Sequence, residues 1–537
     1  MPLAPPPPEA FRGLDPAILA WIESLTTRLD AALARVQQLE DEVARLKKVP
    51  LKPAAARPQP PPRTDHSSEK DRCDPKPRAG REKDPPIDRT VPVALPEHSK
   101  PPNARFHGYE RTTVQELRIE RDNVCFVRER WIDPQTGETF TAPMPLGWQG
   151  HSFGPELRAM VLRMGWKQND SQPVIHQFLK DLGIDISAGE INAILVHQIE
   201  VFATERAAVH QAGIETSACV QSDVTSTRVN GEERSCFVTG DARFVTFDTR
   251  LSHDRLQTLC ALAGWERPSY RVNDEAVARL AEAKLSPGYL DRLLRMPQDV
   301  SLTEAQFDEA FTTAFDEQKT RWVGAKTRTL VHEICALVAA WEQQPALRSM
   351  KLHADDAGHF DGLCAVRGVC WIHEGRHQAK LSPGRNERAC VEVAWFGENY
   401  WDLYRGMQAY REAPSEPEAR RLEQRFDELF ASEPTWGPLQ ARIKLTREKR
   451  AELLCVLEHP AMPLHNNAQE LDARVRVRKR DISFGPRSEA GRAAWDTMQS
   501  VLGTVRRLGL NAWAYLRDRV LGAATIPPLA TLVRARG

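Results

Sequence analysis

Three acidic residues, far apart along the chain, are the side chains best suited to chemistry. Asp223 ends the alternating run "ACVQSD", Asp355 opens the acidic pair in "LHADDAGHF", and Glu470 follows "PLHNNAQ". One Asp after an apolar run is often only a solvated turn. Three carboxylates in a partly open cluster, however, are hard oxygen ligands of the kind that suits Mg²⁺ or Mn²⁺. Two such ions about 4 Å apart can activate a water or a 3′-hydroxyl against a phosphodiester. Asp223, Asp355 and Glu470 are therefore the predicted catalytic residues and the predicted ligands of two metal ions.

The elements around these acids predict how the fold would bring them together. The stretch 213–262 alternates, and its Asn230-Gly231 pair is a strong hairpin signal. We expect one strand to end near Asp223 and two more at about 235–239 and 244–247, followed by a helical stretch and a strand that ends at Asp355. This order is that of an RNase H-like core, in which the first and fourth strands are neighbours. The predicted fold is α/β and multidomain, with a mixed five-stranded sheet interrupted by helical insertions and crossed by the helix of Glu470.

The N-terminal part of the chain predicts self-association and a helical binding region. Apolar residues at 22–46 follow a heptad with mostly β-branched residues at a and Leu at d, which favours a parallel two-stranded coil and hence a homodimer or higher oligomer. The alternative is a helix packed against its own domain. Farther on, Gly183 ends a helix, and Ser187 with Glu190 forms a capping box that opens the next. This pair resembles a DNA-reading helix-turn-helix, although ordinary helical domains contain such pairs too.

The whole chain divides into nine predicted segments. They are a coiled-coil dimerisation segment (1–49), a disordered linker rich in Pro and charge (50–104), a hairpin plus helical, helix-turn-helix-like DNA-binding region (105–212), the first part of the core (213–262), a helical part or insertion (263–349), the second part of the core (350–381), a helical insertion (382–460), the third part of the core with Glu470 and a basic run (461–520), and a C-terminal tail (521–537).

Three sequence blocks carry a resemblance to a known family. "QSDVTSTRVNG", "LHADDAGHF" followed by "CWIHEGRH", and "PLHNNAQELDARVRVRKRDISFGPRSEAG" resemble the catalytic blocks of bacterial DDE-type insertion-sequence transposases. The chain is most similar to the large transposases of the insertion sequence sixty-six group, from about residue 108 to 521. The resemblance implies that Asp223, Asp355 and Glu470 are the catalytic triad of a DNA transposase. Such an enzyme binds the terminal inverted repeats of its element and then cuts and joins DNA strands.

The chain departs from that family in two places. Many relatives have an acidic residue where His465 stands and an Arg where Leu471 stands, and the N-terminal cysteine pairs of a zinc finger are missing. We therefore predict no zinc there. Cys370, His373 and His377 could also suggest zinc, but a fourth ligand is not obvious, since the spacing of Cys364 is unconvincing. Packing and hydrogen bonding are the favoured roles, and His373 could instead contact DNA phosphate.

Several residues near the acids are expected to support them or to contact DNA. Asp356 is predicted to cap a helix or to accept a hydrogen bond beside Asp355, and Asn466 or Asn467 to cap the helix of Glu470. A basic run follows Glu470 and has few compensating acids, so phosphate contact is favoured over a solvated face. Its members are Arg474, Arg476, Arg478, Lys479 and Arg480. The later segment "VRRLGLNAWAYLRDRV", with Trp513 and Tyr515, could be a core helix or could touch a DNA end.

Composition sets the outer limits of these expectations. Lys+Arg and Asp+Glu both number 73, so there is no global basic signal for nucleic acid. The ten cysteines form no Cys-x-x-Cys pair, which fits a reducing compartment, and no apolar run is long enough to span a membrane. We expect a cytoplasmic, nucleoid-associated bacterial protein whose partners are transposon ends, target DNA, a second copy and accessory proteins of the element. The alternatives are an RNase H-like nuclease without strand transfer and a catalytically inactive, coiled-coil DNA-binding regulator.

Overall fold

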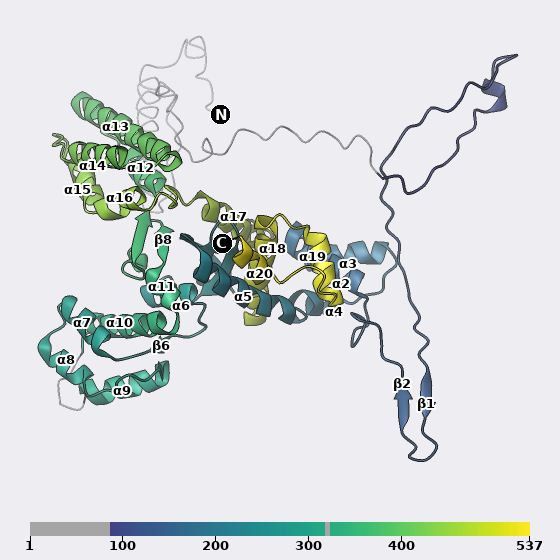
Figure 1. Ribbon diagram of the computed structural model, residues 1–537, viewed down its shortest axis with the longest axis horizontal. Coiled ribbons are helices and arrows are strands. Elements are labelled where there is room, and N and C mark those ends of the chain that lie inside the picture. Colours follow the sequence, from purple (N-terminus) through teal and green to yellow (C-terminus); the bar gives the residue numbers. More distant parts are fainter. Residues whose placement is uncertain (1–85, 317–322, 537) are drawn as a thin grey trace, which may run out of the picture. The chain divides into compact units, whose positions relative to one another are not determined.

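The computed structural model describes residues 86–316 and 323–536, and Figure 1 labels their helices and strands. The predicted coiled coil at 22–46 and most of the predicted linker lie outside the described residues. Among the residues described, no helix is both long enough and apolar enough to cross a membrane.

A five-stranded mixed sheet lies between the helices. Its strands are β3 (Val220–Val229), β4 (Glu232–Gly240), β5 (Val245–Arg250), β8 (Lys351–Ala354) and β9 (Val366–Val369), in the order β5-β4-β3-β8-β9. β3, β4 and β5 pair antiparallel in sequence, whereas β8 pairs parallel with both β3 and β9. The α/β class and the mixed five-stranded sheet are as predicted, and this strand order is compatible with an RNase H-like core.

The first hairpin confirms the turn signal but not the predicted end of its first strand. Asn230 and Gly231 both have positive φ, 51° and 82°, as a two-residue hairpin turn requires. β3 does not end near Asp223, however. It continues to Val229, so that Asp223 pairs with Val238 in the middle of the β3–β4 ladder. The prediction was too short because the polar residues of "DVTSTRV" alternate just as a half-buried strand does.

The first helical region precedes the sheet, and its cap is as predicted. Ser187 accepts a hydrogen bond from the backbone N–H of Glu190 at 3.1 Å, and Gly183 has a φ of 74° after the preceding helix. The helices are α2 (Pro155–Arg163), α3 (Gln172–Asp181), α4 (Ala188–Asn192) and α5 (Glu200–Thr216), with π-helical turns at Met164–Gln168 and Ala193–His197. The hairpin in the region 105–212 has only short, exposed strands, β1 (Arg130–Ile132) and β2 (Thr139–Thr141).

Two helical blocks accompany the sheet: the first lies between β5 and β8, and the second follows β9 and precedes α17. The first contains α6 (Arg255–Ala263), α7 (Asp274–Glu282), α8 (Pro287–Leu293), α9 (Glu304–Asp316), α10 (Ala325–Gln343) and α11 (Pro345–Ser349), with a small unpredicted pair of strands, β6 (Ser269–Tyr270) and β7 (Leu302–Thr303). The second contains α13 (Glu387–Glu412), α14 (Glu416–Phe430), α15 (Gly437–Arg447) and α16 (Arg450–Glu458). Each block has its own apolar core, and the first shares its core with Val220, Leu352 and Ala354 of the sheet.

The opposite face of the sheet carries the C-terminal helices. α17 (Asn467–Ser483) places Ala473 in one small core with Cys236, Val238, Val245 and Phe247 of β4 and β5. α18 (Glu489–Arg507), α19 (Ala512–Leu521) and α20 (Leu529–Ala535) pack with α2 to α5 in another. Asp223 pairs with Val238, and paired residues point to the same face, so Asp223 points toward α17.

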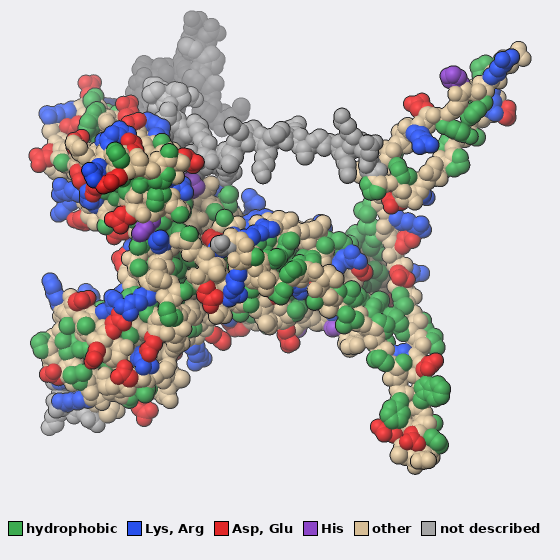
Figure 2. Space-filling view, viewed as in Figure 1, with side chains coloured by type: hydrophobic (Ala, Val, Ile, Leu, Met, Phe, Trp, Pro, Cys, Tyr) green, Lys and Arg blue, Asp and Glu red, His purple; other side chains and the backbone are tan. Residues whose placement is uncertain are grey.

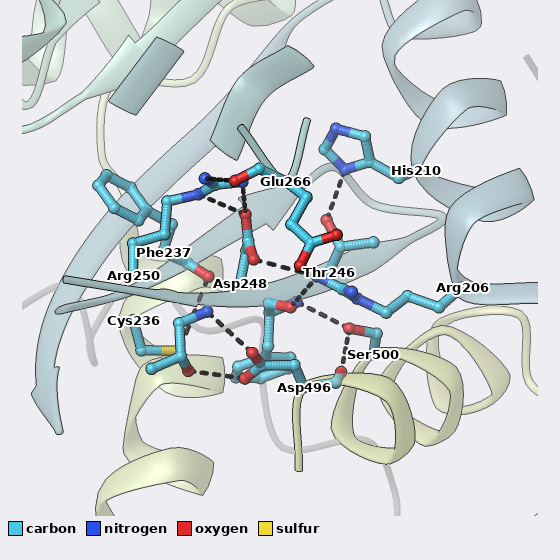
Figure 3. A network of polar contacts seen from close by, with 12 residues as sticks. Arg206, His210, Cys236, Phe237, Thr246, Asp248, Arg250, Glu266, Asp496 and Ser500 are labelled. Atoms are coloured by element: carbon cyan, nitrogen blue, oxygen red, sulfur yellow. Dashed lines mark hydrogen bonds and ion pairs between the residues drawn. The ribbon is translucent and has the colours of Figure 1, made fainter. Parts of the chain in front are cut away.

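Side chains of α18 cover the free edge of β5 (Figure 3). The backbone N–H groups of Val245, Phe247 and Thr249 donate to Thr504 Oγ1 at 3.2 Å, Ser500 Oγ at 2.8 Å and Asp496 Oδ2 at 2.9 Å. Four helical residues rise about 6 Å and two strand residues about 6.7 Å, so the two spacings match. The outward carbonyls of the same three strand residues accept from Thr504, Arg206 and Arg492. An edge strand that would otherwise expose unpaired groups is thereby closed.

Asp496 is the most demanding member of this set. Besides Thr249, it accepts from the fully buried guanidinium of Arg476 on α17. We expect Asp496→Ala to lower the free energy of unfolding by about 3–5 kcal/mol, because a buried cation would lose its carboxylate. Ser500→Ala, which removes the neutral hydrogen bonds with Phe247 N and with the carbonyl of Asp496, should cost about 1–2 kcal/mol. Urea unfolding followed by circular dichroism compares the two, and equal losses would contradict this ranking.

Candidate active site

Asp223 and Asp355 project from neighbouring strands on the same face of the sheet. β3 and β8 pair in parallel with Gln221 opposite His353; Asp223 stands two residues farther along β3, and Asp355 follows Ala354, the last residue of β8. Because side chains alternate with a period of two, both carboxylates lie on the face that α17 covers. The backbone N–H of Ala357 donates to Asp355 Oδ1 at 3.1 Å, so this Asp also shapes the turn that ends the strand.

α17 brings Glu470 to these two acids because both of its ends are tied to β3. Before the helix, Asn466 Nδ2 donates to Ser222 O at 2.9 Å, and Gln221 Nε2 donates to His465 O at 3.0 Å. At the other end, Arg480 Nη1 donates to Ser226 O at 2.6 Å. Asn466 is the N-cap residue, but its side chain makes no capping hydrogen bond. The predicted capping role is therefore wrong for Asn466, which instead fastens the helix to the catalytic strand, while Asn467 is buried in the first turn.

The pKa of Asp223 depends on the charges of the other two acids. The pKa of Asp223 is raised to about 7, mainly by burial and also by the nearby charges of Asp355 and Glu470, although a hydrogen bond from the backbone of Val224 lowers it. A carboxyl group that resists ionisation beside two other acids is a site where a cation would bind favourably. Asp355 and Glu470 thus lie near enough for their charges to act on Asp223.

The donor chemistry fits Mg²⁺, whereas the coordination geometry is not complete. Three carboxylates offer hard oxygen ligands. The ionised form of Asp223 is unfavourable in this site, and a bound divalent cation would stabilise it. In the described part of the chain, however, no group of three or more His, Cys, Asp or Glu side chains is already arranged to hold a metal ion. A bound cation would have to draw the oxygens of Asp223, Asp355 and Glu470 closer together.

α12 (Trp371–Ala379) places the side chains of His373 and Arg376 next to Glu470. His373 Nε2 lies 3.5 Å and Arg376 Nη1 3.6 Å from Glu470 Oε1, and these two nitrogens lie 3.3 Å from each other. Cys370, at the N-cap of α12, is fully buried. The "CWIHEGRH" block therefore serves the site by packing and by contact with the third acid, and the approach of DNA to His373 remains a prediction.

Asp356 forms an ion pair rather than a helix cap. Ala357, not Asp356, precedes the short 3₁₀ turn Gly358–Phe360, so the predicted capping role is wrong. The carboxylate of Asp356 is held by Lys449, which lies between α15 and α16. Lys449 Nζ is also 3.7 Å from Glu374 Oε2. The second helical block thus contributes a cation to the turn that carries Asp355.

Glu374 connects the same block to α12. Its carboxylate is fully buried and accepts from Arg442 Nε at 2.8 Å and from the hydroxyl of Thr446, both on α15. Glu374 follows His373, which contacts Glu470. Lys449 and Glu374 therefore link α15, α12 and the strand end of Asp355, so that the helical block helps to set the position of two of the three candidate acids, Asp355 and Glu470.

The basic run on α17 does not form the predicted phosphate-binding surface. Arg476 is fully buried against Asp496, Phe247 and Trp495, and Lys479 is buried, donating to Gly165 O at 2.6 Å over the ring of Trp166. Neither can contact DNA from these positions, so the prediction is wrong for both. Arg480, also on α17, is half-buried where it contacts β3, whereas Arg474 and Arg478 are exposed. One face of α17 is buried in the protein, and the number of basic residues in the sequence does not show which of them lie on that face.

Sequence reasoning missed two residues that border the site. His353 is buried on β8, neither ring nitrogen has a hydrogen-bond partner among the described residues, and burial lowers its pKa to about 3, helped by His465, His373 and Arg411. Its place two residues before Asp355 was a readable signal. Lys449 gave no such signal, because only the fold brings it to Asp356.

Comparisons with known proteins leave the family open. No family model matches the chain. An uncharacterized protein of Sinorhizobium fredii, y4jO, is 29% identical over 333 residues, which cover 60% of this chain and 99% of that protein. The similarity carries no information about activity.

The raised pKa of Asp223 makes stability depend on pH. Between the ordinary pKa of 3.8 and about 7, the folded protein binds more protons at this group than the unfolded chain does, so stability falls as pH rises through that range. In EDTA, Asp223→Asn should be more stable than wild type at pH 8, by at most about 4 kcal/mol, and equal to it at pH 4. Thermal melts at several pH values test this. Asp427→Asn is a control of opposite sign, because the hydrogen bond from Arg450 lowers the pKa of Asp427.

Lys449 and its neighbour Arg450 provide a matched pair for the role of the helical block. Arg450 is equally cationic but pairs with Asp427 and Glu423 on α14, away from the acids. We expect Lys449→Gln to weaken Mn²⁺ binding by about 10–100-fold, as loss of a group that supports metal ligands does. Arg450→Gln should leave it unchanged. Mn²⁺ titration by electron paramagnetic resonance measures both, and equal affinities would refute the positioning role.

Proposed function

We propose that the protein is a DDE-type DNA transposase with an RNase H-like core. It binds the terminal inverted repeats of its element and catalyses Mg²⁺-dependent strand cleavage and strand transfer. The observation that carries this proposal is the buried carboxyl of Asp223, whose pKa is raised to about 7 by burial and by Asp355 and Glu470. The order of the strands and the crossing of α17 over β3 support the same conclusion.

Asp223, Asp355 and Glu470 would hold the Mg²⁺ ions, which when bound supply a deprotonated attacking oxygen and stabilise the leaving oxygen. The chain's own contribution is position and charge. β3 and β8 hold the first two acids side by side, α17 brings the third, and the Lys449–Asp356 pair fixes the turn after β8. Arg376, whose side chain is 43% exposed, and His373 stand next to Glu470, where they could neutralise a phosphate that approaches it.

The partners follow from the proposed reaction. The substrates are the ends of the element and the target DNA, and a second copy would join through residues 22–46. A nuclease with the same three acids that never joins strands is the main rival, because the acids serve hydrolysis and strand transfer alike. A pre-cut DNA end separates the two, since only a transposase joins its 3′-hydroxyl to a second duplex.

Substitution of the acids should separate chemistry from binding. With DNA that carries the element's inverted repeats, Asp223→Asn, Asp355→Asn and Glu470→Gln should each lower cleavage at least 100-fold, more than the roughly 10–100-fold typical of residues that only support metal ligands. Binding of the ends should stay within about twofold of wild type, because these side chains are not the main phosphate contacts. Gel assays of cleavage and of mobility measure the two. Glu416→Gln, on exposed α14, is the charge-matched control, and wild-type cleavage by any of the three variants would remove that residue from the site.

A further inference from the structure

A cavity of about 640 Å³ lies between α2, α18 and α19. Met160, Leu502 and Val505 give it an apolar wall, and Trp513 contributes an aromatic one. It also gathers cations from three separate elements: Arg163 at the end of α2, Lys167 in the following π-helical turn, and Arg506 in the last turn of α18. No acidic side chain lines this cavity among the described residues.

The cations in this cavity are poorly compensated. Arg506 pairs with Asp472, but the same carboxylate also serves Arg507, so one anion faces two guanidinium groups. Arg163 and Lys167 form no ion pair with any described residue. Burial lowers the pKa of Lys167, and the charges of Arg506 and Arg163 lower it further. Like charges that face one hollow without an acid are costly unless an anion binds between them.

This clustering differs from the surroundings. Figure 2 shows Lys and Arg side chains scattered among Asp and Glu over the drawn face, without a broad basic surface. The basic run of α17 is also no substitute, because Arg476 and Lys479 are buried and occupied. Asp472, however, which holds Arg506, stands two residues after Glu470 on the same helix. The cationic cavity is thus tied to the helix that carries the third catalytic acid.

We propose that this cavity binds a phosphate of the DNA backbone, with Arg163, Lys167 and Arg506 as its partners and Trp513 as the wall against the adjoining nucleoside. The inference rests on the proposed function and deepens it by naming where the substrate's phosphate lies. Of the segment that contains both aromatic residues, Tyr515 is a core residue that bonds Glu205, whereas Trp513 faces the cavity.

The dependence of DNA binding on salt tests the site directly. Each phosphate that a protein neutralises on duplex DNA contributes about −0.9 to the slope of log K against log salt. The double variant Arg163→Gln/Lys167→Gln should reduce the steepness of that slope by up to about 0.9, the contribution of the one phosphate bound in the cavity. The measurement uses the full chain and a fluorescein-labelled duplex in EDTA, so that no cleavage is needed. Because neither side chain is ion-paired and Lys167 is repelled by Arg506 and Arg163, the melting temperature should be unchanged or slightly higher, and such a result would show that the variant is folded.

A charge-matched control and three contrary outcomes complete the experiment. Arg420→Gln/Arg421→Gln removes two cations from exposed α14, where they pair with Glu416 and Glu418, and should leave the slope unchanged. Equal slopes for wild type and the Arg163/Lys167 variant would overturn the proposed site while leaving the transposase proposal intact. Inorganic pyrophosphate that binds wild type but not the variant, with an unchanged DNA slope, would assign the cavity to a small phosphate ester instead. Wild type that binds no DNA would overturn the proposed function itself.

Discussion

The buried pair of Arg476 and Asp496 is the contact on which the arrangement of the site depends. Arg476 lies on α17, six residues after Glu470, and Asp496 lies on α18, where it also bonds the edge strand β5. A guanidinium without exposure to water is tolerated only when a carboxylate faces it, so the two helices cannot slide independently. The position of Glu470 relative to β3 is therefore fixed from two sides, by the pair with α18 and by the bonds of Asn466 and Arg480 to β3.

The three acids also depend on how the surrounding protein compensates their charges. The sheet places Asp223 and Asp355 side by side, and the protein meets the resulting repulsion by keeping protons on Asp223 up to about neutral pH. Lys449 pairs with Asp356, and Arg376 and His373 lie beside Glu470. Asp223 and Asp355 accept hydrogen bonds from backbone N–H groups, and Asp223 forms no ion pair in the described part of the chain. That residue is accordingly the one whose ionisation a divalent cation would change most.

How much of this was readable in the sequence depends on the range of the signal. Local signals worked: Asn230-Gly231 gave the hairpin, Ser187 gave the helix cap, and polar-apolar alternation gave the strands. The motif spacing also placed the three acids at matching points of the fold, although it ended β3 too early. Predictions that depend on contacts between distant parts of the chain were wrong or were not made. The inward turn of Arg476 and Lys479, the use of Asn466 as an anchor and the reach of Lys449 to Asp356 depend on which helix face meets which strand, and one chain without its fold does not reveal that.

The parallel pairing of β3 with β8 also bears on how the molecule reaches its native state. β3, β4 and β5 follow one another in the sequence and can pair through short connections. About a hundred residues, which form the first helical block, separate β5 from β8, and only then can β8 pair with β3. Closing so long a loop is entropically unfavourable and slow. We therefore expect the strands around Asp223 to pair early, as local hairpins, and the strand before Asp355 to join them late. The pairing of β3 with β8, and with it the approach of Asp355 to Asp223, should form together with the core that the first helical block shares with Val220, Leu352 and Ala354.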